Sequence, residues 1–390
     1  MKFLHPFMLG LVLTLCAGPS SAALVKAKPA TSKAKASVGK AGARRPAVAK
    51  PKRKPSKVDY SGEAVNFTEW KAVNDFADEL ALRQGFPRAE LSTLFSQVRY
   101  VDSAIQLVKP APPGKPKNMR AVRELLIEPI RINAGLKFWA ENADVLAKAE
   151  REYGVPAEII VGIIGIETVY GRNTGRFRVL DVLTTLAFAY PPAPNQAARM
   201  AFFRGELENT LLLARKNSID PFALLGSFAG AIGLPQFMPG SVLAYGVDYD
   251  NDGAVNLRGS SADAIGSVAN FLVQHGWLRE QNGPLVYQAS VAPGRGWDKF
   301  IGAGLSAKFK LAELYAEGVT SPSPPPAERQ YGLIDLQNGA EATEYWIASN
   351  NFFAITQYNR SYFYAMSVLE LGRAVKLGLG TVPAPRAESL

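Results

Sequence analysis

The feature that most constrains this chain is its most apolar run outside the N-terminal leader, residues 159–166, which ends at the acid Glu167. Pro156 suits the first turn of a helix, and the run that follows is long enough for about three turns. The run therefore predicts a buried helix in which Glu167 shares a face with Ile163 and Ile164. Burial disfavours a carboxylate and raises its pKa, so Glu167 is predicted to be a general acid.

A second interpretation of Glu167 stays open at this point. An acid near a helix end also serves as a structural carboxylate, and Arg172 and Arg176 are close enough in sequence to pair with it. A paired carboxylate would keep its charge near neutral pH and could not donate a proton.

The rest of the composition limits which catalytic groups and metal sites the chain can contain. The chain has two histidines, His5 and His275, and one cysteine, Cys16, and two of these three lie in a leader that is expected to be removed. A cysteine nucleophile, a disulfide framework and a multi-histidine metal centre are then excluded. The surroundings of His275 are typical of a helix C-terminus, which favours a structural role over a place in a serine triad. Catalysis by carboxylate side chains is therefore the type of catalysis that remains.

The first 57 residues predict export. Lys2, an apolar stretch and small residues up to Ala22 are typical of a signal peptide over residues 1–22, so the protein is expected to be exported to the periplasm. Lipid anchoring at Cys16 is the less favoured alternative, because Leu15 occupies the position where a small residue is needed. Residues 23–57 hold twelve Lys or Arg, no acid and scarcely an apolar side chain, so this basic tail is predicted to be disordered.

The positive charge of the chain belongs to its first 57 residues. They hold 13 of the 44 basic residues and none of the 34 acidic ones, so the formal charge of +10 becomes −3 for residues 58–390. A basic tail alone would favour nucleic-acid binding, but export and this balance set that function aside. We expect the tail to bind an anionic membrane or wall surface, or to be a solvated spacer.

Residues 58–380 are predicted to carry the fold, with residues 381–390 as a loose C-terminus. Helical patterns cover residues 67–84, 120–127, 132–153, 179–189, 197–216 and 262–275. After residue 277 the patterns favour short strands, over residues 285–287, 333–336 and 344–347, and a loop over 321–326. Apart from the leader, no run approaches membrane-spanning length. The predicted fold class is α+β, mainly α.

An acidic loop predicts a calcium site. Asp248, Asp250 and Asp252 supply oxygens at alternate positions and Gly253 follows at the sixth, which is the spacing of an EF-hand-like loop. The twelfth position is Gly259, where an ordinary EF-hand has a bidentate Glu. The alternative, an Asp-rich turn without a metal, stays open.

Two further stretches predict a ligand-binding cleft. Residues 226–239 repeat Gly, which allows a close backbone approach, and include the hydrogen-bonding side chains of Ser227 and Gln236. Residues 350–364 combine aromatic rings with amides and hydroxyls, a set that suits the apolar face and the OH groups of a sugar. Taken singly, such aromatic residues are more often part of a core.

Five blocks together resemble the lytic murein transglycosylase B family: residues 167–172, residues 226–239, the Asp loop, residues 263–270 and residues 355–359. The resemblance runs from about residue 67 to residue 376, and the blocks occur in the family's order. It implies a lysozyme-like core over about residues 155–280, with a helical domain and a small β-containing lobe over about residues 283–345, around a deep groove.

The resemblance also implies the function. Family members cleave the MurNAc–GlcNAc β-1,4 bond of peptidoglycan and leave a 1,6-anhydro-MurNAc end, so no water is consumed. Glu167 would be the sole catalytic acid/base, with the neighbouring N-acetyl group stabilising the cation. Sugar-lining residues would be Ser227, Gln236, Tyr358, Asn359 and Tyr364, and Ca²⁺ ligands would be Asp248, Asp250, Asp252, Ala254 and Asp263. Calcium would be structural, no organic cofactor is expected, and the enzyme would act on glycan strands as a monomer.

The chain departs from the family pattern at two places in the expected cleft. Phe271 stands where a cleft tyrosine is expected, which removes one hydroxyl contact. Residues 192–196 stand where an arginine pair is expected to meet the stem peptide, and Arg199 is the nearest substitute.

Two rival functions stay open beside the transglycosylase. A hydrolytic muramidase on the same fold would use water in place of the MurNAc 6-OH. A non-catalytic wall-binding protein would hold glycan without cutting it, although the intact Glu167 motif speaks against that.

Overall fold

A computed structural model describes residues 62–109 and 116–380 of the 390-residue chain. The predicted signal peptide, Cys16, the basic tail and the loose C-terminus lie outside these residues. Within them, no helix is both long and apolar enough to cross a membrane.

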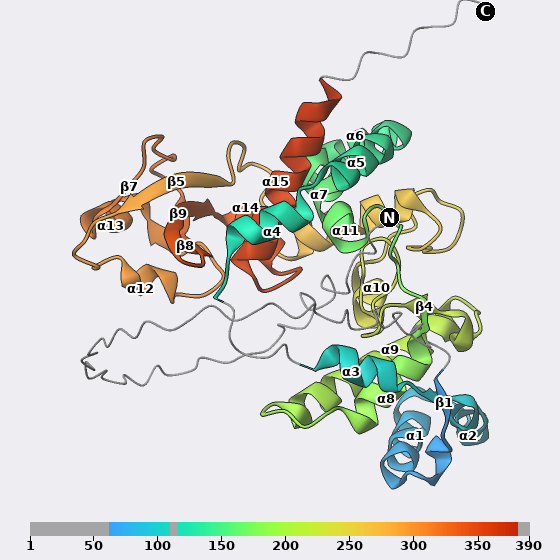
Figure 1. The fold of residues 1–390 in the computed structure, drawn as a ribbon. Helices are drawn as coiled ribbons and strands as arrows, with labels where there is room; N and C mark the ends of the chain where they lie inside the picture. Colours follow the sequence, from blue (N-terminus) through green and yellow to red (C-terminus); the bar gives the residue numbers. More distant parts are fainter. Residues whose placement is uncertain (1–61, 110–115, 381–390) are drawn as a thin grey trace, which may run out of the picture. The chain divides into compact units, whose positions relative to one another are not determined.

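Helices make up most of the described structure (Figure 1). In chain order they are η2 (Phe67–Glu69), α1 (Lys71–Gln84), α2 (Arg88–Gln97), α3 (Asp102–Val108), α4 (Met119–Leu126), α5 (Pro129–Glu141), α6 (Ala143–Tyr153), α7 (Ala157–Thr168), α8 (Val179–Ala189), α9 (Gln196–Lys216), η3 (Pro221–Ala223), α10 (Pro239–Tyr245), α11 (Ser261–Gln274), α12 (Asp298–Ile301), α13 (Leu311–Ala316), α14 (Asn350–Thr356) and α15 (Tyr362–Leu379).

The strands form two short antiparallel pairs and one antiparallel sheet. One pair joins β1 (Glu63–Ala64) to β2 (Arg99–Tyr100), and the other joins β3 (Phe177–Arg178) to β4 (Leu225–Gly226). The sheet has the order β6-β8-β9-β5-β7. Its strands are β5 (Val286–Val291), β6 (Phe309–Lys310), β7 (Val319–Thr320), β8 (Gln330–Asn338) and β9 (Glu341–Ser349).

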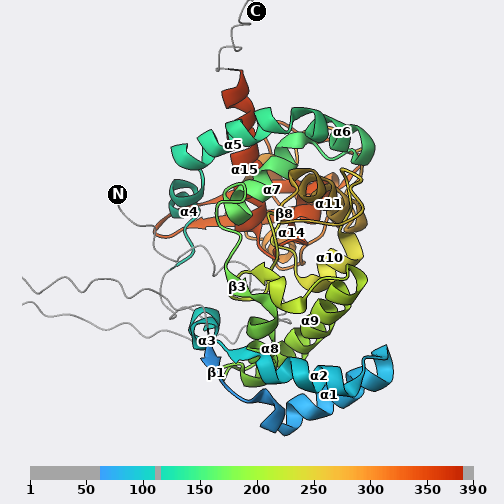
Figure 2. The same cartoon turned by 90° about the vertical axis from the view of Figure 1, so that its right-hand side faces the viewer.

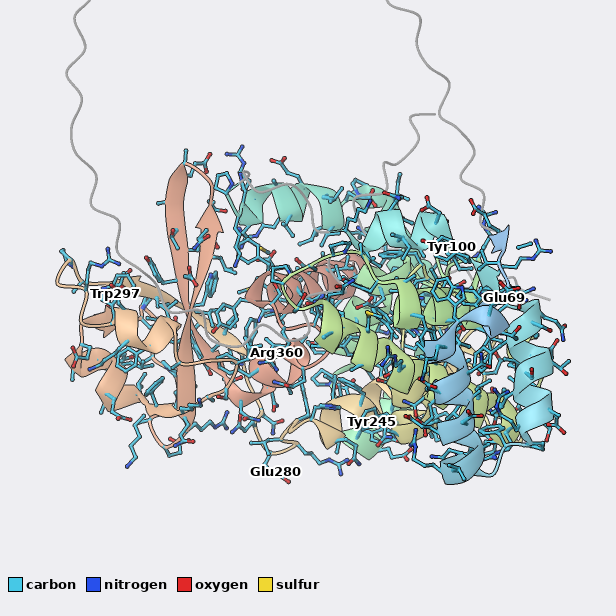
Figure 3. All side chains as sticks on the ribbon, turned by 90° about the horizontal axis from the view of Figure 1, so that it is seen from below. Glu69, Tyr100, Tyr245, Glu280, Trp297 and Arg360 are labelled. Carbon is cyan, nitrogen blue, oxygen red and sulfur yellow. The ribbon has the colours of Figure 1, made fainter. Side chains whose placement is uncertain are left out.

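The sheet has two buried faces. Side chains alternate across a strand, so Ile334 on β8 packs into the main hydrophobic core while its neighbour Leu333 packs into a second, smaller core. The second core holds Trp297 and Phe300 from the α12 region, and Trp297 is labelled in Figure 3 among these strands. The sheet is therefore attached to the helices by one face and covered by its own short helices on the other.

The predicted fold class, α+β and mainly α, is confirmed. The helix over residues 179–189 is confirmed to the residue, and residues 321–326 form a loop. The single helix over residues 132–153 is wrong, because the chain breaks at Asn142 into α5 and α6. The Asn142 side chain donates to the Phe138 carbonyl at 2.8 Å, a local bond that competes with helix continuation.

Glycines bring α7 and α15 into backbone contact. A Cβ on Gly162 would lie 2.3 Å from the Val368 carbonyl oxygen, and a Cβ on Gly372 would lie 2.0 Å from the Glu158 carbonyl oxygen. These distances leave room for hydrogen only. Figures 1 and 2 both show α15 alongside α7, and this packing carries the start of α15 to the end of α7.

A half-buried ion network ties α4 to the sheet and to α15. Arg123 on α4 binds Glu344 of β9 at 2.6 Å and Glu370 of α15 at 2.8 Å. Hydrogen bonds from Arg123 lower the pKa of Glu344 to about 2, so that carboxylate is charged at any physiological pH.

Candidate active site

Glu167 lies in the last turn of α7 with its carboxyl surrounded by protein, although the residue as a whole is partly accessible to solvent. Burial raises the pKa of Glu167 from 4.5 to about 7, and a hydrogen bond from Tyr364 opposes part of that rise. The Tyr364 hydroxyl donates to Glu167 Oε1 at 2.6 Å, across 197 residues of sequence. Near neutral pH the carboxyl is therefore divided between its acid and its carboxylate forms.

The alternative role of Glu167, a carboxylate paired with Arg172 or Arg176, is not found. In the part of the chain that the structure describes, Tyr364 is the only hydrogen-bond partner of the carboxyl, and no ion pair reaches it. No arginine contributes to the shift of its pKa. The prediction of a desolvated acid agrees with this environment.

Tyr364 and Tyr358 form a pair of buried hydroxyl donors at the site. Their rings stack with centroids 6.2 Å apart and planes 13° apart. Tyr358 donates to the Pro235 carbonyl oxygen at 2.6 Å. Burial, and then the nearby charge of Glu167, raise the pKa of both tyrosines well above the usual range, so both stay protonated.

The block of residues 226–239 closes over the end of α7. The Thr168 hydroxyl, next to Glu167, donates to the Leu234 carbonyl oxygen at 2.9 Å. Gln236 adopts a left-handed backbone with φ of 52°, and its amide donates to the Gly233 carbonyl at 2.9 Å. The sequence signal for Thr168 was its position directly after the acid, but only the folded chain shows its partner.

Ser227 and Asn359, the other two predicted sugar-lining residues, are both buried. The Ser227 hydroxyl oxygen accepts the backbone amides of Ala231 at 3.1 Å and Ala229 at 3.3 Å, so it holds the turn that begins the glycine-rich block. The Asn359 carbonyl accepts the Ser361 amide at 2.6 Å, at the entry to α15. Both residues therefore shape segments that carry other site residues.

Phe271, which stands where a cleft tyrosine was expected, packs among other aromatic rings. Its ring lies 4.8 Å from Tyr358, 5.5 Å from Phe237 and 3.9 Å from His275, centroid to centroid. His275 also bonds the Phe271 carbonyl through Nδ1 at 2.7 Å, at the C-cap of α11. The structural role expected for His275 agrees with these contacts.

The acidic loop gathers three of its predicted ligands. Oxygens of Asp248, Asp250 and Asp252 lie within 4.8 Å of one another. Asp263 is fully buried, and its two carboxylate oxygens accept the backbone amides of Tyr249 at 2.8 Å and Asn256 at 2.7 Å. Asp263 therefore braces both ends of the loop, outside the group of three.

Comparison with known proteins places this geometry in a family. Residues 67–373 match the family model of the transglycosylase SLT domain. Membrane-bound lytic murein transglycosylase B of Escherichia coli (strain K12) is 40% identical over 314 residues, which cover 78% of this chain and 82% of the relative.

Solved structures agree with that assignment. Soluble lytic transglycosylase SltB1 from Pseudomonas aeruginosa is 41% identical, with a TM-score of 0.71 over 79% of this chain and 99% of that chain. Escherichia coli lytic transglycosylase Slt35 in complex with calcium is 38% identical, with a TM-score of 0.71 over 82% and 97% of the two chains. The chain belongs to the lytic murein transglycosylase B family, with its lysozyme-like fold.

Proposed function

We propose that Glu167 is the single acid/base of this peptidoglycan lytic transglycosylase. The observation that carries the proposal is a carboxyl whose pKa burial raises to about 7 and whose one partner in the described chain is a tyrosine hydroxyl. Such a group gives up and takes back a proton near neutral pH. Among the described residues no second carboxylate contributes to the pKa shift of Glu167, whereas a retaining glycosidase with a carboxylate nucleophile holds its two carboxyl groups only about 5–5.5 Å apart.

The reaction then runs in two proton transfers. Glu167 gives its proton to the glycosidic oxygen while the bond from that oxygen to C1 of MurNAc breaks. The carboxylate that results takes the proton of the MurNAc 6-OH as this oxygen bonds to C1, which closes the 1,6-anhydro ring and restores the acid. The N-acetyl group of the sugar stabilises the positive charge at C1 between the two steps.

Tyr364 serves both steps through one hydrogen bond. Before the first transfer it fixes the orientation of the Glu167 carboxyl, because Oε1 is the atom it contacts. After the transfer the same bond becomes charge-assisted and stabilises the carboxylate. Tyr358, Asn359, Gln236 and Ser227 are proposed to line the sugar sites around this pair. One relative, SltB3 from Pseudomonas aeruginosa, 26% identical, was solved with NAG-anhNAM-pentapeptide, which supports glycan binding.

The pH profile tests the roles of Glu167 and Tyr364 together. Turnover on a soluble glycan is expected to fall as the pH rises through about 7, since the acid form starts the reaction. Tyr364→Phe removes a bond that favours the carboxylate, so it should lower kcat and move this alkaline limb to higher pH. An alkaline limb near 4.5, the ordinary pKa of Glu, would contradict the proposed environment. An unmoved limb in Tyr364→Phe would remove Tyr364 from the mechanism.

The acidic loop is proposed to bind Ca²⁺ as a structural ion. Its donor set fits, because three carboxylates within 4.8 Å repel one another unless a cation neutralises them, and hard oxygen ligands suit Ca²⁺. Asp248, Asp250, Asp252 and the Ala254 carbonyl would hold the ion. Asp263 would join them, because each of its carboxylate oxygens accepts one backbone amide and has a second lone pair for the ion. The calcium complex of Slt35 supports the choice of metal.

Calcium is expected to stabilise the fold and leave the chemistry unchanged. An ion bound only by the native state adds RT ln(1 + [L]/Kd), about 2.7 kcal/mol at 100 Kd, so millimolar Ca²⁺ should raise Tm. Asp252→Ala should abolish this rise in Tm. At temperatures below its Tm, the variant should have the kcat of the unaltered enzyme. Melting that is insensitive to Ca²⁺ in the unaltered protein would reduce the loop to an acidic turn.

Export, a periplasmic location, the tail as an anionic-surface tether and the monomeric state are part of the same proposal. Export, the location and the tether rest on the sequence of residues 1–57 and on the membrane-bound relative, and the monomeric state is what the family resemblance implies.

A further inference from the structure

The chain makes an unusual turn directly after Glu167. Val169, Tyr170 and Gly171 have φ angles of 52°, 55° and 85°, so three consecutive residues are left-handed and two of them are not glycine. Val169 is β-branched, for which this conformation is a true outlier. Such strain persists only where surrounding contacts hold it.

The ring of Tyr170 fills a slot that two glycines leave open. A Cβ on Gly135 of α5 or on Gly165 of α7 would lie 2.5 Å from the Tyr170 hydroxyl, and the ring packs on Phe138 at 5.2 Å. The hydroxyl is buried and has no hydrogen-bond partner among the described residues. The ring and its fit therefore hold the turn, and the hydroxyl contributes no bond to it.

A buried cation holds the backbone of Gly165, one of the two glycines that line the slot. Arg131 is 1% exposed, and its guanidinium donates to the carbonyl of Gly165 at 3.1 Å and to that of Leu126 at 2.9 Å. These carbonyls lie at the C-terminal ends of α7 and α4, where the helix dipole favours a positive charge. The Gly165 carbonyl also accepts the Val169 amide at 3.1 Å, so Arg131 and the first residue of the turn share one acceptor.

The same turn is also connected to the glycine-rich block of residues 226–239. Thr168, between Glu167 and Val169, donates to Leu234, and the Gly171 amide donates back to the Thr168 hydroxyl at 3.0 Å. A change in the path of residues 169–171 would therefore move both Glu167 and the glycine-rich block. Misplacement of a reacting group by about 1 Å can cost about 10²-fold in rate.

We propose that Arg131 and Tyr170 are positioning residues: the buried guanidinium and the ring in the Gly135–Gly165 slot hold the end of α7 so that Glu167 meets Tyr364 and the glycosidic oxygen. This inference rests on the proposed role of Glu167. Neither residue touches substrate, and each acts through the backbone of the turn.

Steady-state kinetics at temperatures below Tm distinguish a positioning role of these residues from a role in stability alone. Tyr170→Leu empties the slot and should lower kcat by about tenfold or more with little change in KM. It should also move the alkaline limb of the kcat profile to higher pH, because a loosened Tyr364 bond no longer favours the carboxylate. Tyr170→Phe keeps the ring and should rescue most of the turnover.

Arg131 is tested in the same way. Arg131→Lys keeps the charge but replaces a forked donor with a point charge, so it should show a partial form of the same changes. The Tyr170→Leu shift of the alkaline limb should vanish in a Tyr364→Phe background, since the bond that transmits it is then absent. Leu91→Ala, a core truncation in α2, is the control that lowers Tm alone.

Two results would overturn the inference. If Tyr170→Leu and Arg131→Lys lower Tm as Leu91→Ala does but keep the kcat and limb of the unaltered enzyme, the slot is structural only. If the limb shifts equally with and without Tyr364, the effect does not run through that bond. Failure of the proposed function looks different, because Glu167→Gln would then stay active whatever the slot variants do.

Discussion

Replacing Glu167 with glutamine is expected to preserve the fold and remove turnover. The amide is nearly the size of the carboxyl and can still accept the Tyr364 hydrogen bond, but it cannot carry a proton from one step to the next. General acid–base catalysis is worth about 10²–10⁴-fold, and here one group performs both transfers, so the loss should lie at or above the upper figure. Turnover of soluble glycan by the purified variant measures it.

The same substitution should stabilise the protein at neutral pH. The folded-state pKa of Glu167 is raised, so the native state loses stability relative to the unfolded chain as the pH rises from about 4.5 to about 7. Glutamine does not titrate and avoids this loss. Glu167→Gln should therefore melt at a higher temperature than the unaltered protein above about pH 7 and show no such gain near about pH 4.

Glu158→Gln is the matched control for both measurements. Glu158 lies on the same helix, but it forms a surface ion pair with Lys376 at 2.9 Å. Its loss should change stability by less than about 1 kcal/mol and leave activity in place. Retention of more than about a tenth of the activity by Glu167→Gln, against the full loss that acid/base catalysis predicts, would show that another group does the chemistry.

Gly372→Ala is expected to be among the most destabilising single-methyl changes in the described fold. Its Cβ would lie 2.0 Å from the Glu158 carbonyl oxygen, and because that atom is backbone, α15 has to move away from α7. Overpacking costs about 1–3 kcal/mol and occasionally more, and a clash with backbone belongs at the upper end of that range. Urea unfolding measures the loss, and activity should fall with it, because Tyr364 lies on the helix that is displaced.

The control for Gly372→Ala is the same change at Gly205. That glycine lies within α9, and a Cβ added there would have nothing within 4 Å, so alanine should stabilise by about 0.5–1 kcal/mol through helix propensity. Equal stability of the two variants would mean that α7 and α15 are not in backbone contact.

Local patterns were sufficient for elements with a strong period or clear ends. The apolar run and Pro156 predicted α7, and Gly154 marked the end of α6 with a left-handed backbone. They did not predict α15, because the cluster of aromatic residues at its start resembles a ligand surface as much as a helix. The cap that begins α15, Ser361 accepting the Tyr364 amide, is one hydrogen bond in a polar stretch.

The site was predictable in its acid but not in its partners. The apolar neighbours of Glu167 adjoin it in sequence, so desolvation followed from the chain alone. Tyr364 was expected to line a sugar site, and its bond to Glu167 depends on two helices meeting through Gly162 and Gly372. Arg131 gave no signal either, because a lone arginine in a helical pattern is usually solvated. Contacts of this kind arise from tertiary packing and leave no periodic pattern.

Cleavage of the glycan by one acid without water is measured by mass spectrometry of products formed from peptidoglycan in heavy-oxygen water. We expect muropeptides with 1,6-anhydro-MurNAc ends and no heavy oxygen, and no such products from Glu167→Gln. Reducing MurNAc ends that carry the heavy oxygen would contradict it, because they would show that water attacks C1 and that the enzyme is a hydrolytic muramidase.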